Sequence, residues 1–386
     1  MKQAIRVVHV IETLGHGGAE YALLALLPAL RASGMEPSLV VLDGSSDRCR
    51  VLLPDFQRAG VPVTFLAAPG LVGKAREFQM QLRGQPVDIV HAHLTRSVLV
   101  AGWPGAPENQ PPPVMVGSLH NMGYDKPVPV GLRLRHWVKK RLAVRAACRF
   151  DLWLAVSSAV QAHYWRHWRL PPERMMVVPN PVVTPLQPAH ALGKTPDPYP
   201  PLIVLPGRLV PEKGHDFALE LAGRFQQENV PLQWLFAGGG PLLENLQAQI
   251  DARGLRDLVQ ITGALSQSEM HQRMAEATVV IQPSWQEGFG MTAAEAMALG
   301  KAVLVSDAGG LPETVGDAGR IVPAGDYQAW QAALRYLLDS SVARHTLGQA
   351  AQDRVAQCFS LDAISRKYLQ VYRWLLGYEQ PVEADA

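Results

Sequence analysis

The sequence predicts an α/β protein with two domains, each built around a doubly wound parallel sheet. A chain of 386 residues is long enough for two domains of roughly 150 to 200 residues, each burying its own core. In both halves, short apolar runs alternate with helix-like segments, a pattern typical of parallel sheets covered by helices on both faces. A proline-rich stretch interrupts this alternation in the middle of the chain.

The first half opens with a predicted strand over residues 5–14, a glycine turn over 15–20 and a helix ending near Gly34. This order is typical of the start of a Rossmann-like βαβ unit. The turn lacks the G-x-G-x-x-G spacing of a dinucleotide site, and Asp43 has no further support as a ribose ligand, so the pattern weighs against NAD binding. Further strands are expected over 37–44, 61–67, 86–94, 113–121 and 151–158.

A change of composition marks the boundary between the two halves. Prolines are concentrated between Pro179 and Pro201, where they disfavour helix and central strand and favour an extended linker. The second half opens with strand, turn and helix start over 201–216. Its later strands are expected over 233–240, 258–264, 278–283 and 301–307. The predicted division is 1–183 for the first domain, 184–200 for the linker, 201–365 for the second domain, and 366–386 for a C-terminal helix and tail that can pack back on the first domain.

Charge and cysteine usage exclude several classes of protein. The formal net charge is +2, so overall charge does not favour nucleic acid as a partner. Cys49, Cys148 and Cys358 lie far apart without C-x-x-C spacing, which argues against a zinc site or a disulfide framework and favours a reducing cytoplasm. The N-terminal apolar segments are short and are interrupted by Glu12 and Pro28, so neither a signal peptide nor a transmembrane helix is expected.

One segment of the first half combines positive charge with an apolar side. Residues 131–150 form a predicted helix without acidic residues, and residues 163–170 add tryptophans and arginines. The basic residues of the predicted helix are Arg133, Arg135, Lys139, Lys140, Arg141, Arg145 and Arg149. A basic amphipathic helix with interfacial tryptophans favours docking of 131–169 on an anionic membrane surface. The alternative is a solvated helix whose apolar side packs on its own domain.

Three strand-end loops of the second half carry candidate ligands for phosphate and sugar. Arg208 and Lys213 could hold a diphosphate, although cations at such spacing are commonly only solvated. Residues 238–240 are a glycine turn, and Glu287 and Glu295 flank a helix start whose N–H groups suit phosphate or sugar oxygens. Because ligands bind beyond the carboxyl ends of parallel strands, these loops are expected to converge on a nucleoside-diphosphate site.

Each of the two glutamates also has a simpler interpretation. Thr292 and Glu295 have the spacing of a capping box, in which the glutamate only returns a hydrogen bond to the helix start. Glu287 lies in a polar turn and could be only solvated. Spacing alone leaves these alternatives open.

The motifs around these residues closely resemble the retaining glycosyltransferases of family 4, also called glycosyl transferases group 1, which adopt the GT-B fold. The resemblance rests on residues 206–214, 237–241, 287–300 and 306–315 in the second half, and on 17–20 and 88–94 in the first. It covers nearly the whole chain. It implies two Rossmann-like domains that face a central cleft, with an acceptor bound by the first and a nucleotide sugar by the second.

The resemblance also implies roles for individual residues. Arg208 and Lys213 would stabilise the departing diphosphate, Glu287 would accept hydroxyls of the donor sugar, and Glu295 would hold the ribose hydroxyls. The implied catalytic residues are Arg208, Lys213, Glu287 and His93, with His120 as a second residue on the acceptor side. The implied donor-binding residues are Gly17, Gly18, Gly239, Leu265, Phe289, Gly290, Met291 and Glu295, with 263–265 lining the base.

The chemistry implied by the resemblance is transfer with retention of anomeric configuration. No nucleophile motif is present, which favours departure and attack on one face of the sugar, with the leaving diphosphate assisting removal of the acceptor proton. No D-x-D sequence occurs, so Arg208 and Lys213 would replace a divalent metal, and no metal or cofactor beyond the nucleotide sugar is expected. Pro181 and Gln286 depart from residues common in the family, which leaves the hinge and the donor sugar open.

We therefore expect a cytoplasmic enzyme, peripheral on the inner face of the membrane. It would move a hexose-like sugar from a nucleoside-diphosphate sugar to a hydroxyl of a lipid-linked or surface-polysaccharide acceptor, such as lipopolysaccharide or exopolysaccharide. Two other functions stay open: a nucleotide-sugar epimerase of GT-B fold, and a non-catalytic relative that binds nucleotide sugar. The retained Arg208, Lys213, Glu287 and Glu295 weigh against the non-catalytic alternative.

Overall fold

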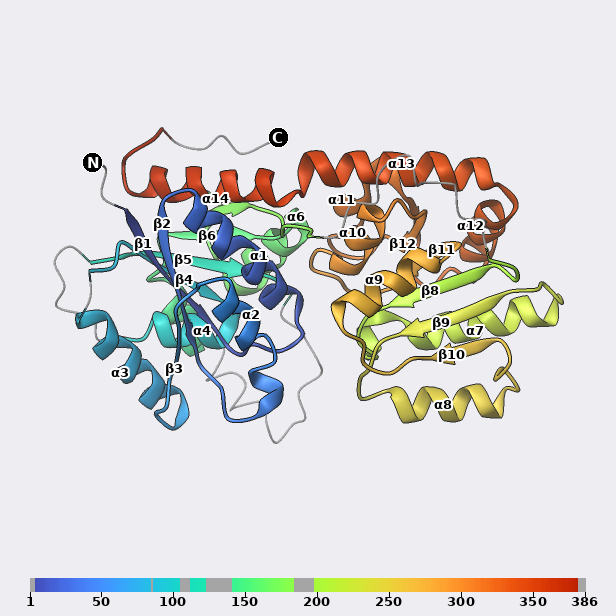
Figure 1. The fold of residues 1–386 in the computed structure, drawn as a ribbon, viewed down its shortest axis with the longest axis horizontal. Coiled ribbons are helices and arrows are strands. Elements are labelled where there is room, and N and C mark those ends of the chain that lie inside the picture. The colour runs from blue at the N-terminus through green and yellow to red at the C-terminus, as the bar shows by residue number, and fades with distance from the viewer. Residues whose placement is uncertain (1–3, 85, 105–111, 123–140, 184–197, 381–386) are drawn as a thin grey trace. The chain divides into compact units, whose positions relative to one another are not determined.

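The computed structural model describes residues 4–84, 86–104, 112–122, 141–183 and 198–380. The chain divides into two compact units, each organised around its own parallel sheet (Figure 1). Unit 1 comprises residues 1–181 and 361–386, and unit 2 comprises residues 182–360. The predicted α/β architecture with two Rossmann-like sheets is confirmed.

Unit 1 contains a seven-stranded sheet in the order β3-β2-β1-β4-β5-β6-β7, and all neighbouring strands are parallel. Its strands are β1 (Ile5–Ile11), β2 (Met35–Val41), β3 (Val63–Phe65), β4 (Ile89–His93), β5 (Val114–Leu119), β6 (Leu152–Ala155) and β7 (Met175–Val177). Its helices include α1 (Gly18–Ala32), α2 (Leu53–Arg58), α3 (Gly70–Arg83), α4 (Thr95–Ala101), α6 (Ser158–Trp168) and α14 (Leu361–Leu375). Strand β7 was not predicted, because three residues followed closely by Pro179 carry too little periodicity.

Unit 2 contains a six-stranded parallel sheet in the order β10-β9-β8-β11-β12-β13. Its strands are β8 (Leu202–Pro206), β9 (Gln233–Ala237), β10 (Val259–Ile261), β11 (Val279–Gln282), β12 (Val303–Ser306) and β13 (Arg320–Val322). Its helices include α7 (His215–Gln227), α8 (Leu243–Ala252), α9 (Gln267–Glu276), α10 (Met291–Ala298), α11 (Leu311–Val315), α12 (Tyr327–Asp339) and α13 (Ser341–Cys358). The short edge strand β13 was not predicted.

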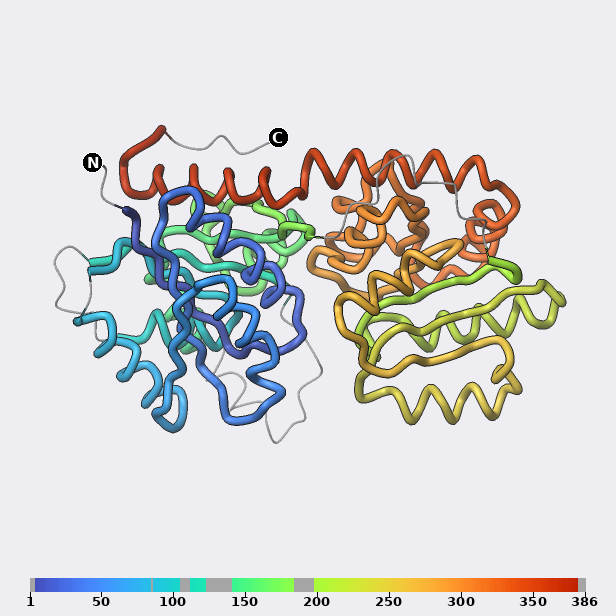
Figure 2. The backbone as a smooth tube through the Cα atoms, viewed as in Figure 1, coloured from blue at the N-terminus to red at the C-terminus, as the bar shows by residue number. Residues whose placement is uncertain are grey.

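The C-terminal helix α14 belongs to unit 1, which corrects the predicted boundary between residues 365 and 366. Ile364, Tyr368, Val371 and Tyr372 form a buried stripe at helical spacing and join the core of unit 1. In Figure 2 the red α14 runs beside the blue α1, and the two helices are in contact. A boundary at 365 would cut this continuous helix, which begins at Leu361.

Each unit has its own hydrophobic core, as expected for domains of this size. Most of the expected linker, residues 184–197, lies outside the described residues. Residue Val182, which was assigned to the first domain, instead forms a parallel bridge with Ser360 in unit 2. Among the described residues, no helix has the length and apolarity needed to cross a membrane.

Candidate functional site

Three strand-end loops of unit 2 are in direct backbone contact. They are residues 207–214 after β8, 238–240 after β9 and 283–290 after β11. The Leu209 N–H donates to the Gly239 carbonyl at 3.0 Å, and the Trp285 N–H donates to the Glu212 carbonyl at 2.8 Å. The β8 loop thus lies between the other two, in the order that the sheet gives its strands. These contacts form one continuous surface at the carboxyl edge of the sheet, where ligands of such folds bind.

Gly214 allows the β8 loop to approach the β11 loop. Its φ is +74°, and a Cβ at this position would lie 2.0 Å from the carbonyl oxygen of Pro283. No residue with a side chain could occupy this position without moving the backbone of one loop. The neighbouring Lys213 is thereby held against the residues that follow β11.

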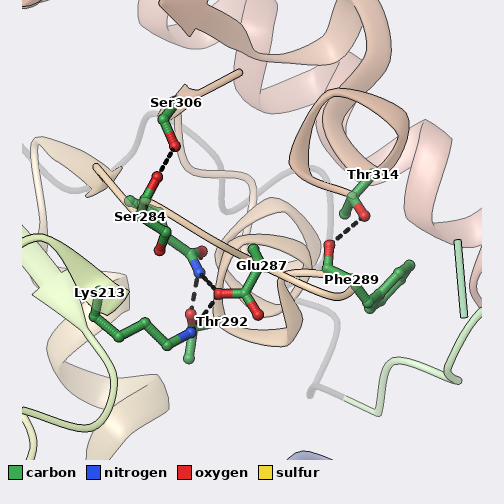
Figure 3. A network of polar contacts seen from close by, with 8 residues as sticks. Lys213, Ser284, Glu287, Phe289, Thr292, Ser306 and Thr314 are labelled. Carbon is green, nitrogen blue, oxygen red and sulfur yellow. Dashed lines mark hydrogen bonds and ion pairs between the residues drawn. The ribbon is translucent and has the colours of Figure 1, made fainter. Parts of the chain in front are cut away.

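Lys213 and Glu287 form an ion pair at the centre of this surface (Figure 3). Each side chain is only 15% exposed. Gln282 Nε2 donates a 2.7 Å hydrogen bond to the same Glu287 oxygen that pairs with Lys213. The structure therefore brings together a cation and a carboxylate that lie far apart in the sequence, in the arrangement expected if one binds phosphate and the other sugar hydroxyls.

Helix α10 begins directly beside this ion pair. Its N-cap is Gly290, whose φ is +95° and which has no side chain to cap the helix. The preceding Phe289 carbonyl accepts a hydrogen bond from the Thr314 hydroxyl, which fixes the entry of the loop into the helix (Figure 3). Because the first backbone N–H groups of a helix lack intrahelical partners, those of Met291 and the residues after it provide donors for an anion.

The capping-box interpretation of Thr292 and Glu295 is wrong. The N-cap is Gly290, two residues before Thr292, so Thr292 lies inside the first turn of the helix, and its hydroxyl donates to Gln282 Oε1 at 3.2 Å. Glu295 is 8% exposed, and its Oε1 lies 3.8 Å from Nε2 of His271 on α9. The carboxylate of Glu295 is therefore not used to cap the helix.

The other predicted residues of unit 2 lie around this centre. Arg208 is exposed on the β8 loop, and its side chain makes no hydrogen bond or ion pair with the described residues. Gly239 lies against the β10 loop, since a Cβ there would be 2.9 Å from the Ala264 nitrogen. Leu265 is half-buried in that β10 loop, directly before the capping box of α9 at Ser266. The structure thus joins the β10 loop to the same edge of the sheet.

Unit 1 contains a second cluster, a hydrogen-bonded row of histidines. His9 Nδ1 lies 3.0 Å from His93 Nε2, and His93 Nδ1 lies 3.1 Å from His120 Nε2. His91 lies beside them and bonds to the hydroxyls of Ser118 at 2.8 Å and Tyr372 at 2.6 Å. From the sequence, His91, His93 and His120 are all predicted at or just past strand ends, but only His93 and His120 were expected in the site. His9 was not expected there, and alternation along β4, which places residues 91 and 93 on one face, was not used.

These imidazoles are neutral at neutral pH. Burial lowers the pKa of His9 to about 3 and that of His120 to about 4, with the Asn180 hydrogen bond opposing the shift at His120. Burial, followed by the adjacent imidazoles, lowers the pKa of His91 and His93 well below the ordinary value. A neutral imidazole has one donor and one acceptor nitrogen, so the tautomers along the row are coupled.

Three of these rings are close enough to suggest a metal site. The ligand nitrogens of His9, His91 and His93 lie within 4.8 Å of one another. However, both nitrogens of His91 are hydrogen-bonded to hydroxyl groups, and His9 Nδ1 faces His93 Nε2 at hydrogen-bonding distance. Hydrogen bonds therefore account for both nitrogens of His91 and for the facing nitrogens of His9 and His93, whereas the buried His9 Nε2 has no hydrogen-bond partner among the described residues.

A pocket with aromatic walls lies beside His120. Its lining includes Thr95, His120, Asn121, Trp153, Tyr164 and Trp168. Trp153 and Tyr164 are buried, and Trp168 is half-buried. Aromatic faces next to hydrogen-bonding groups can bind an amphipathic ligand. Sequence reasoning missed this pocket, because its residues come from four separate segments of the chain.

Gly17 and Gly18 lie in unit 1 at the start of α1. Gly17 is the N-cap with extended backbone, and Gly18 is the first residue of the helix. A Cβ at Gly17 would lie 2.1 Å from Glu20 Oε2, so the loop is closely packed at this position. The two glycines are thus placed where a helix presents unpaired backbone N–H groups.

The arginines in the described part of the basic segment are exposed, whereas its alanines are buried. Residues 141–147 are helical, and residues 131–140 lie outside the described part of the chain. Ala143 and Ala146 pack with Trp168 of α6, so the two segments are neighbours. Trp165 of α6 is 50% exposed. The exposed basic residues on these segments are Arg141, Arg145, Arg149, Arg166 and Arg169.

Several known proteins are similar to this chain. The family model described as Glycosyl transferases group 1 matches residues 193–354, and that described as Glycosyltransferase Family 4 matches residues 16–185. The MMP alpha-(1->4)-mannosyltransferase of Mycolicibacterium hassiacum is 33% identical over 235 residues, covering 59% of this chain and 55% of that protein. The alpha-maltose-1-phosphate synthase of Mycolicibacterium smegmatis is 31% identical over 269 residues, covering 63% of this chain and 67% of that protein. The similarity therefore spans about half of the mannosyltransferase.

Among solved structures, HepE of Anabaena in complex with UDP is similar over nearly its whole length. The TM-score is 0.75 at 18% identity, and the match covers 95% of this chain and 99% of that chain. At this identity the likeness concerns the fold. It extends over both units.

Proposed function

The chain belongs to the group 1 glycosyltransferases of family 4, and we propose that it is a retaining glycosyltransferase with a nucleoside-diphosphate sugar as donor. The acceptor would be a hydroxyl of a lipid-linked or surface-polysaccharide molecule. The observation that carries this proposal is the pairing of Lys213 with Glu287 at the N-terminus of α10. A cation, a carboxylate and free helix N–H groups at one sheet edge match the diphosphate and the sugar of such a donor.

In this proposal the two ends of the donor are held by different groups. Lys213 and Arg208 bind the diphosphate, and Glu287 accepts hydrogen bonds from the sugar hydroxyls. Arg208 is exposed and without a partner among the described residues, so its guanidinium can turn to a ligand at little cost. Further donor contacts are assigned to Gly17, Gly18, Gly239, Leu265, the backbone of Phe289, Gly290 and Met291, and Glu295 at the ribose.

The transfer step exchanges one bond of the anomeric carbon for another. The bond to the diphosphate oxygen breaks, the bond to the acceptor oxygen forms on the same face, and the acceptor proton passes to the leaving diphosphate. Lys213 and Arg208 stabilise the charge that develops on the diphosphate, a task that positioned cations perform without a metal. We therefore propose that the reaction requires no divalent ion.

The acceptor is assigned to unit 1. His120 follows β5, and the pocket lined by Trp153, Tyr164 and Trp168 lies next to it. His93 at the end of β4 is fully buried, and both of its ring nitrogens face other histidines, so in this proposal it acts on the acceptor through His120. Aromatic side chains offer apolar faces, and His120 and Asn121 offer hydrogen bonds. We assign these groups to contact with one edge of the acceptor, because the pocket itself has room for little more than a water molecule.

The exposed basic residues of 141–169 support docking on an anionic membrane at the cytoplasmic face. The exposed Arg166 and Arg169 lie one and four positions after the exposed Trp165, a combination that favours the interface of a charged bilayer. Co-sedimentation with vesicles containing phosphatidylglycerol tests the docking. The triple variant Arg141→Glu, Arg145→Glu and Arg149→Glu should lose binding, whereas Arg253→Glu, Arg256→Glu and Arg273→Glu in unit 2, with the same change of charge, should retain it. Equal binding by both variants would contradict membrane docking through this surface.

A thermal-shift screen tests the proposed donor class. The ligands compared are UDP-linked, GDP-linked and ADP-linked sugars. Binding is detectable as a thermal shift because a ligand at a hundredfold excess over its Kd stabilises the folded protein by about 2.7 kcal/mol. One of them should raise the unfolding temperature of the wild type, and Lys213→Met should reduce that shift. Formation of an epimer from the donor without an acceptor would favour the epimerase alternative, and no shift with any nucleotide sugar would contradict the proposal.

A further inference from the structure

The carboxylate of Glu287 is held through one of its two oxygens. Gln282 Nε2 donates to Oε2 at 2.7 Å, and Lys213 pairs with the same Oε2. Within the described part of the chain, no side chain donates a hydrogen bond to Oε1. One oxygen is therefore committed to protein contacts, and the other can accept a hydroxyl of a ligand.

Gln282 is rigidly placed. It is the last residue of β11, is 1% exposed and pairs in register with Val305 of β12. Its Oε1 accepts a 3.2 Å hydrogen bond from the Thr292 hydroxyl in the first turn of α10. An ionised carboxylate only accepts hydrogen bonds, so the amide must turn its NH₂ group to Glu287 and its oxygen to Thr292. Hydrogen bonds are thus donated from Thr292 to Gln282 and from Gln282 to Glu287, and both ends of the amide have a partner.

We propose that Gln282 and Thr292 are positioning residues that keep Glu287 aimed at the donor sugar when Lys213 turns to the diphosphate. This inference rests on the proposed function, in which Lys213 binds phosphate and Glu287 binds sugar. Lysine is a point charge on a flexible four-carbon stem, so it leaves Oε2 readily for a doubly charged ligand. Gln282 is held by the sheet and stays. The amide thereby preserves the orientation of the carboxylate during the exchange of partners.

The first test removes the amide while keeping a side chain of similar size. Gln282→Leu should lower the release of nucleoside diphosphate from the donor, measured as kcat/KM, by about 10- to 100-fold, the equivalent of one hydrogen bond to a charged group. Thr292→Val should lower kcat/KM less than Gln282→Leu does, and Thr292→Ser, which retains the hydroxyl, should have a kcat/KM close to that of the wild type. Gln226→Leu is the matched control, because this amide donates only to the Gly254 carbonyl on the surface of the same unit. Thermal unfolding of each variant shows whether it folds.

The second test changes the pH dependence. Gln282→Glu places a second carboxylate next to Glu287, and two carboxylates at this distance share a proton, which raises one pKa of the pair. Below that pKa the protonated acid can donate as the amide does, and above it the two charges repel each other. The ratio of variant to wild-type kcat/KM should therefore rise as the pH falls from about 8 to about 5. A side chain that merely fills space would leave this ratio constant.

Two results would overturn the inference while leaving the proposed function intact. In the first, the wild type is active and the kcat/KM of Gln282→Leu lies within about twofold of the wild-type value. In the second, the ratio of the kcat/KM of Gln282→Glu to that of the wild type does not vary with pH. Absence of nucleoside-diphosphate release by the wild type from any nucleotide sugar would overturn the proposed function and the inference together. The behaviour of the wild type therefore distinguishes the two failures.

Discussion

The buried histidines of unit 1 should make the stability of this unit fall in acid. Burial lowers the pKa of His9 to about 3 and that of His120 to about 4 in the folded protein, whereas an unfolded chain has histidines near 6.5. As the pH falls, the unfolded state therefore binds protons before the folded state does. The stability due to these neutral rings is complete above about pH 6.5 and is lost as the pH falls toward the folded-state values.

The expected loss is large. Between pH 7 and pH 5, a histidine with an unfolded pKa of about 6.5 and a folded pKa of 4 or below loses about 1.9 kcal/mol. His9 and His120 together therefore account for about 4 kcal/mol, and His91 and His93, whose pKa values are also lowered, add to this loss. Since domains are typically stable by about 5 to 15 kcal/mol, unit 1 should approach unfolding near pH 5.

Urea unfolding at pH 7, 6 and 5 measures this loss. Hydrogen exchange of the backbone amides in β1 and β4 serves as the probe, so that the measurement reports on unit 1. The variant His9→Asn keeps a polar group near Nδ1 and removes one titrating ring, so its free energy of unfolding should depend on pH less steeply by about 1 kcal/mol per pH unit. His345→Asn, an exposed histidine on α13 in unit 2, is the control and should leave the slope unchanged. Equal stability of the wild type at pH 7 and pH 5, or an unchanged slope in His9→Asn, would refute the reasoning.

Other predictions concern unit 2. Gly290→Ala should lower the free energy of unfolding by about 1 to 3 kcal/mol, because φ is +95° and the new Cβ would lie 2.6 Å from Leu311 Cδ2. Gly254→Ala has a similar φ of +67° but open space and should cost only about 1 kcal/mol, so equal losses would contradict the contact argument. Arg208→Ala should raise the KM for the donor without changing the unfolding temperature, and an unchanged KM would remove Arg208 from the site. Addition of a chelator should leave nucleoside-diphosphate release unchanged, and strong inhibition would contradict the metal-free reaction.

Periodicity was sufficient to predict most of the fold. Apolar runs bounded by turns identify eleven of the thirteen strands of the two sheets, because both faces of a parallel sheet are buried. The missing β7 and β13 are three-residue strands, and each forms one edge of its sheet. For α14, the apolar stripe can be recognised in the sequence, but the unit against which it packs cannot. Amphipathic spacing predicts which face of a helix is buried and does not predict what covers that face.

The centre of the site could be predicted because sheet topology determines it. Lys213 and Glu287 follow β8 and β11, which are neighbours in a parallel sheet, so their loops meet at one edge. Gln282 was not predicted as a residue of the site, because a polar residue at the end of an apolar strand is commonly interpreted as marking only where the strand ends. Thr292 was misassigned as the N-cap because its spacing to Glu295 fits a capping box, whereas the N-cap is Gly290, two residues earlier.

The histidine row shows the limit of a single sequence. His93 and His120 follow apolar strands and are visible as strand-end polar residues. His9 lies within an apolar run, and only the register that pairs it with His91 on the next strand brings it to the row. The pairing of two strands that lie about eighty residues apart is a long-range contact, which local sequence does not encode.

The most direct test of the proposed donor site is the rate of nucleoside-diphosphate release by Glu287→Gln compared with the wild type. The substitution preserves the size of the side chain and removes its charge, so the fold should persist. The account predicts a loss of about 100-fold or more with the nucleotide sugar that stabilises the wild type. Release at a rate close to that of the wild type would contradict the assignment of Lys213 and Glu287 as the centre of the site.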